Sequence, residues 1–158
     1  MKDDLVQTFL NEARRLEVLV ADLYTIFKKS FPEDYNFWHQ LALEEKDHAA
    51  LIDAIKANPN LSNQFVSGFA PGLLQDIQKI NELLSSLIVK FTGEKQARKT
   101  AFDTAITVEK SAGEINYQNF MTQETDSWII KGLQHINEYD RDHLNRIEEY
   151  MKGNKLSD

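Results

Sequence analysis

The chain is organised around residues 37–52, which read FWHQLALEEKDHAALI. Within this stretch Glu45 and His48 are three positions apart, so on a helix their side chains share one face, one turn from each other. Apolar residues recur at steps of three and four on both sides of the pair, and this face is therefore expected to be buried. A carboxylate in a dry core costs several kcal/mol unless it is paired or bound to a cation. The pattern therefore predicts a positive charge opposite Glu45.

Three further stripes of apolar residues with helical period also carry an acid at their centre. The predicted helices cover about 4–29, 34–56, 92–121 and the segment from the turn at 122–126 to Gly153. The three additional central acids are Glu17, Glu109 and Asp140. Asp140 and His143 repeat the spacing of Glu45 and His48, which makes two acid-x-x-His pairs in the chain.

The connections predict how these helices are arranged. The turn around Pro32 is short, so the first two helices are antiparallel neighbours, with Glu17 and Glu45 both roughly 17–18 Å from the turn. Glu109 and Asp140 likewise lie at similar distances from the second turn, at 122–126, so they are expected at the same level of the bundle. We expect one all-α domain over 1–158, a four-helix bundle of two antiparallel hairpins. Residues 57–91 form a long crossover with an additional helix from Leu73, after an irregular stretch at 57–72.

Composition excludes several classes of function. The 158 residues are 42% hydrophobic, which is enough to bury the core of one domain. A formal net charge of −7 argues against a nucleic-acid partner. The chain has no cysteine, so any metal must be held by carboxylates and imidazoles. The start of the chain has no apolar signal core and no segment is long and apolar enough for a membrane span, so we expect a soluble cytoplasmic protein.

The predicted arrangement brings six polar residues to one level of the bundle core. They are Glu17, Glu45, His48, Glu109, Asp140 and His143. Four carboxylates and two imidazoles bring four negative charges into a water-poor volume, and two divalent cations would neutralise them. This ligand chemistry suits iron, manganese or zinc. The pattern of di-iron and di-manganese carboxylate bundles is met at five of the six positions, and the sixth is Asp140 instead of glutamate.

Residues 15–24, 41–48 and 105–117 resemble the helices of rubrerythrins, within the ferritin-like superfamily. The resemblance extends from about residue 8 to 150 and implies a ferritin-like fold in which two iron ions are bound by Glu17, Glu45, His48, Glu109 and His143. It also implies that Tyr24 and Tyr117 lie beside the cluster and act on the oxygen substrate, and that the diferrous centre reduces peroxide or dioxygen. The rubredoxin module needs four cysteines, so an external electron-donor protein is expected. No haem is expected, because Lys46 stands where a bacterioferritin has its haem-ligating methionine.

Two alternatives remain open. The same centre would serve iron handling or storage if it oxidises Fe(II) and the subunits form a closed shell. In the second alternative the chain is a structural or interaction bundle with a vestigial site. Two residues motivate it: the side chain of Asp140 is one methylene shorter than the family's glutamate, and Ala112 stands where rubrerythrins carry an additional glutamate. The additional helix covers the bundle or forms a subunit contact, and a homodimer is the expected assembly.

Overall fold

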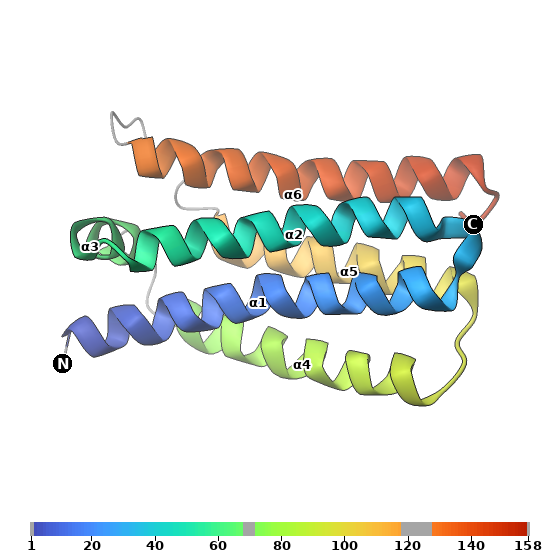
Figure 1. Cartoon of the computed structure of the whole chain (residues 1–158), viewed down its shortest axis with the longest axis horizontal. Helices are drawn as coiled ribbons and strands as arrows, with labels where there is room; N and C mark the ends of the chain where they lie inside the picture. The colour runs from blue at the N-terminus through green and yellow to red at the C-terminus, as the bar shows by residue number, and fades with distance from the viewer. Residues whose placement is uncertain (1, 68–71, 118–127, 158) are drawn as a thin grey trace.

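The computed structural model describes residues 2–67, 72–117 and 128–157. Over these residues the chain forms a helical bundle whose long helices lie side by side (Figure 1). The elements in order are α1 (Lys2–Ser30), the 3-10 turn η1 (Pro32–Asp34), α2 (Tyr35–Lys56), α3 (Pro59–Ser67), α4 (Leu73–Gly93), α5 (Arg98–Tyr117) and α6 (Trp128–Gly153). The predicted all-α class is confirmed. None of the described helices contains an apolar stretch of the kind that a membrane span requires.

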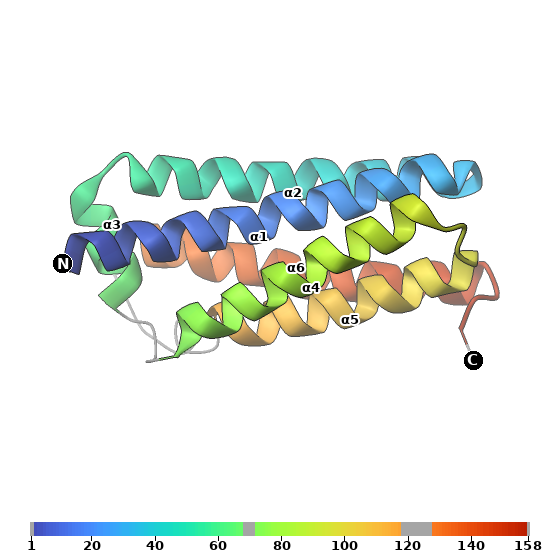
Figure 2. The ribbon, with the colours of Figure 1, turned by 90° about the horizontal axis from the view of Figure 1, so that it is seen from below.

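The first predicted hairpin is formed by α1 and α2, which η1 connects. Pro32 occupies the first turn of η1, where a missing backbone N–H costs nothing. Figures 1 and 2 show α1 and α2 side by side in opposite directions, and α5 and α6 form a second such pair. The predicted bounds of these four helices differ from the observed ones mainly at the start of α5.

The crossover contains one helix more than predicted. Residues 59–67 were expected to be irregular, but they form α3. Pro59 is its first residue, and the Asn58 side chain accepts hydrogen bonds from the backbone N–H groups of Asn60 (3.1 Å) and Leu61 (3.3 Å). An asparagine cap followed by proline starts a helix, although the same pair read in isolation resembles a turn.

The helix α4 covers the bundle. This helix runs obliquely along the length of the bundle, between α1 and α5 (Figure 2), and its side chains Ile77, Ile80 and Leu84 are buried. It also ends later than predicted, at Gly93, and the extended backbone of Glu94 (φ −131°, ψ 140°) separates it from α5. The prediction that a helix opens at 92–94 was therefore wrong, because α5 begins at Arg98.

Two apolar clusters form the core. The larger one lies toward the α1–α2 turn and contains Tyr24, Phe27, Trp38 and Phe102, with ring centroids 5.3 Å apart for Tyr24 and Trp38 and 4.6 Å apart for Trp38 and Phe102. The smaller one contains Val6, Leu10, Ile52, Ile55 and Ile77, among others. Along α2, Glu45 and His48 lie between Ala42 of the larger cluster and Ile52 of the smaller one, and on α1 Glu17 directly follows Leu16 of the larger cluster.

A buried ion pair ties the helix ends together near η1. Asp34 is 1% exposed and accepts hydrogen bonds through Oδ2 from Arg98 Nε (2.7 Å) and through Oδ1 from Arg98 Nη2 (2.5 Å) and the Tyr150 hydroxyl (2.8 Å). The interaction with Asp34 raises the pKa of Arg98. Its partner Asp34 is far away in the sequence, so spacing could not reveal the pair.

Candidate metal centre

The first group of acid and imidazole side chains lies between α1 and α2. Glu17, Glu45 and His48 are all buried, with 4%, 2% and 6% of their surfaces exposed. His48 Nδ1 lies 3.1 Å from Glu45 Oε2 and 3.6 Å from Glu17 Oε2. Each residue offers one ligand atom, and these atoms lie within 4.8 Å of one another, so the group could hold a metal ion.

The second group adds α5 and α6 to the same level. His143 Nδ1 lies 2.9 Å from Glu45 Oε1 and 3.6 Å from Glu109 Oε1, and its ring stacks 5.7 Å from that of His48. Glu45, Glu109 and His143 again bring one ligand atom each within 4.8 Å of one another. Glu45 belongs to both groups, with Oε2 toward His48 and Oε1 toward His143. The structure thus brings together five of the six predicted ligands, from four helices.

The Nδ1 atom of His143 faces the buried carboxylates of Glu45 and Glu109. It is buried and has no hydrogen-bond partner among the described residues, although Glu45 Oε1 lies 2.9 Å away. Buried polar atoms are normally satisfied, and an exception calls for an explanation such as an ion. Carboxylate oxygens and an imidazole nitrogen that converge without sulfur fit iron, manganese or zinc.

The charges in this core are compensated by protons as long as only protein groups are present. Burial and the neighbouring charge of Glu45 raise the pKa of Glu17 to about 8, and burial also raises the pKa of Glu109. Burial alone would lower the pKa of His48, but hydrogen bonds with Glu17 and Glu45 outweigh it and raise this pKa to about 11. For His143, the carboxylates of Glu109 and Glu45 likewise outweigh burial and raise the pKa to about 12. The close contacts with the imidazoles of His143 and His48 lower the pKa of Glu45 despite its burial. Divalent cations would take the place of these protons.

Tyr24 lies beside the cluster, as the resemblance implied. Its ring is fully buried on α1, and its hydroxyl donates a short hydrogen bond to Glu109 Oε1. The predicted ligand Asp140 and the second predicted tyrosine, Tyr117, belong to α6 and α5, but their side chains lie outside the described part of the chain, as does that of Ala112. Their place in the site stays a prediction.

Sequence reasoning missed Glu44. It is neighbour to Glu45 on α2 and binds the outer nitrogen of His143, with 2.7 Å between Glu44 Oε2 and His143 Nε2. Arg146 also donates to Glu44 Oε2 (2.7 Å). A signal was present, because His143 and Arg146 are one helical turn apart and lie on one face of α6. The spacing of His143 and Arg146 does not indicate which face of α2 they contact, so Glu44 could not be identified as their partner.

Comparisons with known protein families, with curated proteins and with solved structures gave no match.

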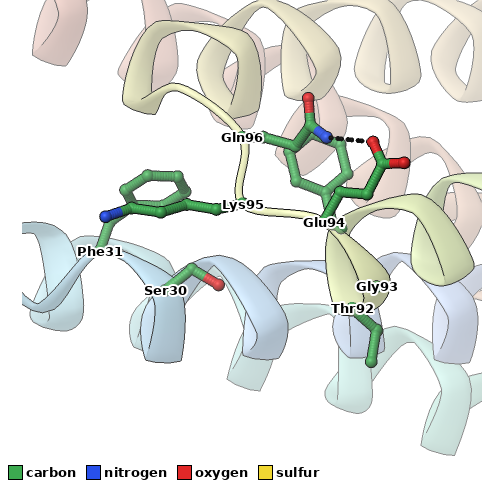
Figure 3. A pocket seen from close by; sticks show the side chains of 8 residues that line it. Ser30, Phe31, Thr92, Gly93, Glu94, Lys95 and Gln96 are labelled. Atoms are coloured by element: carbon green, nitrogen blue, oxygen red, sulfur yellow. Dashed lines mark hydrogen bonds between the residues drawn. The ribbon is translucent and has the colours of Figure 1, made fainter.

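A surface pocket of about 330 Å³ opens at the end of the bundle near η1. It is lined by Ser30, Phe31, Phe91, Thr92, Gly93, Glu94, Lys95 and Gln96, and Figure 3 shows the hydrogen bond from Gln96 to Glu94 at one side of it. None of the buried acids or histidines lines it. The remaining histidines are also outside the two groups: His39 stacks on Tyr35, and His135 is exposed.

Proposed function

We propose that this chain is a rubrerythrin-like protein of the ferritin-like superfamily, a di-iron oxidoreductase that reduces peroxide or dioxygen. One observation carries the proposal: two buried groups of acid and imidazole ligands share Glu45. A carboxylate with one oxygen toward each of two imidazoles is suited to bridge two cations. A site for a single structural ion would need only one of the groups.

The donor set supports two iron ions. Glu17 and His48 would hold one ion and Glu109 and His143 the other, with Glu45 between them and Asp140 as the sixth ligand. Four carboxylates would match the charge of two divalent cations, which removes the cost of burying them. Manganese and zinc accept the same ligands, so metal identity is part of the proposal and is tested with it.

Two Fe(II) ions in this site would supply one electron each to a bound peroxide or dioxygen. The protein would contribute the surroundings of that reaction. The apolar clusters on both sides of the ligands exclude bulk water. Tyr24 holds a phenolic proton next to Glu109, from where it would be able to donate this proton to the oxygen substrate. An external protein would then return the electrons.

The ferritin-like topology is part of the same proposal. It is supported by the two antiparallel pairs, α1 with α2 and α5 with α6, and by the crossover between them, in which α4 spans the length of the bundle. In ferritin-like di-iron proteins, a glutamate from each of two helices and an acid-x-x-His pair from each of the other two face the bundle centre. Here α1 and α5 supply Glu17 and Glu109, and α2 supplies Glu45 with His48.

The test is stopped-flow mixing of the anaerobically Fe(II)-loaded protein with hydrogen peroxide and, separately, with dioxygen. We expect oxidation of the bound Fe(II) faster than that of free Fe(II), with a larger acceleration for the physiological oxidant. The Glu45→Ala variant is the matched control and should lose the acceleration. Oxidation no faster than that of free Fe(II) in the wild type would contradict the proposal and favour a vestigial site.

A further inference from the structure

Glu44 is held from three sides by hydrogen-bond donors on two helices. Its Oε2 atom accepts from His143 Nε2 (2.7 Å) and Arg146 Nη1 (2.7 Å), and its Oε1 atom accepts from Gln40 Nε2 (2.9 Å). The side chain is 20% exposed, so it lies at the outer edge of the core rather than inside the ligand cluster. Arg146 is fixed in turn by Asp142 (3.2 Å). This is more support than one surface carboxylate needs.

The contact with Glu44 determines which nitrogen of His143 keeps its proton when the imidazole is neutral. An ionised carboxylate can only accept, so the proton of this hydrogen bond is on Nε2. Once Nε2 is the N–H donor, the lone pair of a neutral imidazole is on Nδ1. Nδ1 is the atom that faces Glu45 and Glu109. The contact therefore presents the ligand atom of His143 to the centre of the bundle.

We propose that Glu44 is a positioning residue, which fixes the orientation and tautomer of His143 as a metal ligand, and that Arg146 and Gln40 hold Glu44 in place. The inference rests on the proposed metal binding and adds residues that the ligand pattern does not contain. A carboxylate on the outer nitrogen of a ligating histidine raises its basicity, and loss of such a partner typically weakens metal affinity about 10–100-fold. The arrangement also joins α2 to α6 at the outer edge of the core.

Zn(II) is the probe for the test, because it is diamagnetic and accepts this ligand set. The chain has only four histidines, so ¹⁵N-histidine labelling gives a spectrum in which each imidazole can be assigned. In the Zn(II)-loaded wild type, we expect the His143 Nε2–H proton to exchange slowly and to resonate downfield, with Nδ1 bound to the metal. Calorimetric titration of the metal-free protein with Zn(II) gives the affinities of the two sites.

The variants are Glu44→Ala, Glu44→Gln and, as a control with the same charge change, Glu82→Gln on the exposed face of α4. Glu44→Ala should weaken one of the two Zn(II) sites about 10–100-fold and abolish the slow exchange of the His143 proton. Glu44→Gln should have a smaller effect on both, because its amide oxygen still accepts from Nε2. It also preserves the volume, so it reports on the role of the carboxylate even if the alanine variant folds poorly. Glu82→Gln should change neither quantity.

Unchanged Zn(II) affinities and an unchanged His143 spectrum in Glu44→Ala would overturn the positioning role and leave the proposed metal centre standing. A wild type that binds no Zn(II) and no Fe(II) would overturn the centre, and the positioning role with it. The two failures are therefore distinct.

Discussion

Among single residues, Glu45 has the largest predicted effect on metal binding. It belongs to both ligand groups, whereas Glu17 belongs to the one with His48. We expect Glu45→Ala to abolish binding of both metal ions, and Glu17→Ala to leave one ion bound near His143. Elemental analysis of each variant after Fe(II) loading and desalting measures this directly. Two metal ions per chain in Glu45→Ala would contradict the bridging role.

Asp140 gives a second prediction at this scale. Its side chain is one methylene shorter than the glutamate of the di-iron pattern, so the ion nearest His143 should bind more weakly than the one nearest His48, in two resolved steps. Asp140→Glu should tighten the second step, and Asp140→Asn should empty that site by removing a ligand charge. Anaerobic Fe(II) titration of the three proteins checks this. Equal stoichiometry and affinity in all three would exclude Asp140 from the site.

The alternative to a ligand role is that Asp140 belongs to a structural ion pair. Thermal melts of the metal-free Asp140→Asn protein give the control for the titration: a large loss of stability without a change in metal content would assign Asp140 to a structural ion pair.

At the scale of helices, the Asp34–Arg98 pair should be the strongest polar link at the end of the bundle near η1. Removing one partner of a buried pair costs about 3–5 kcal/mol, and because Arg98 is 27% exposed we expect roughly 2–3 kcal/mol for Arg98→Met. Arg14→Met is the matched control, since Arg14 and Asp53 are both exposed and such pairs contribute about 1 kcal/mol or less. Urea unfolding of the metal-free proteins measures both, and equal losses would contradict the assignment.

The long amphipathic helices could be predicted from the sequence because burial imposes a 3.6-residue period on them. The same period placed five predicted ligands on inward faces: Glu17, Glu45, His48, Glu109 and His143. Their distances from the helix turns indicated that the acids of neighbouring helices lie at the same level of the bundle. Short elements lack this signal. The helix α3 was missed because an Asn-Pro pair at its start also fits a turn. Glu44 and Asp34 were missed because their partners are distant in sequence, and only the packed bundle brings them together.

For the molecule as a whole, metal affinity should rise with pH. Carboxylates and hydrogen bonds raise the pKa of His48 to about 11 and that of His143 to about 12, and burial raises the pKa of Glu17 to about 8. At neutral pH these groups therefore hold protons that a metal must displace. The loaded protein binds fewer protons than the metal-free one, so a higher pH favours loading. Zn(II) calorimetry at pH 6 to 8, in buffers of different ionisation enthalpy, should show proton release. An affinity independent of pH would contradict this electrostatic account.

The most direct test of the central claim is the metal content of the protein itself. The two groups around Glu45 predict about two iron ions per chain after growth in iron-rich medium or anaerobic Fe(II) loading, and a higher melting temperature of the loaded than of the metal-free protein. Elemental analysis with a melting curve of each form gives both quantities. A chain that carries substoichiometric metal after loading and melts at the same temperature with and without Fe(II) would contradict the claim.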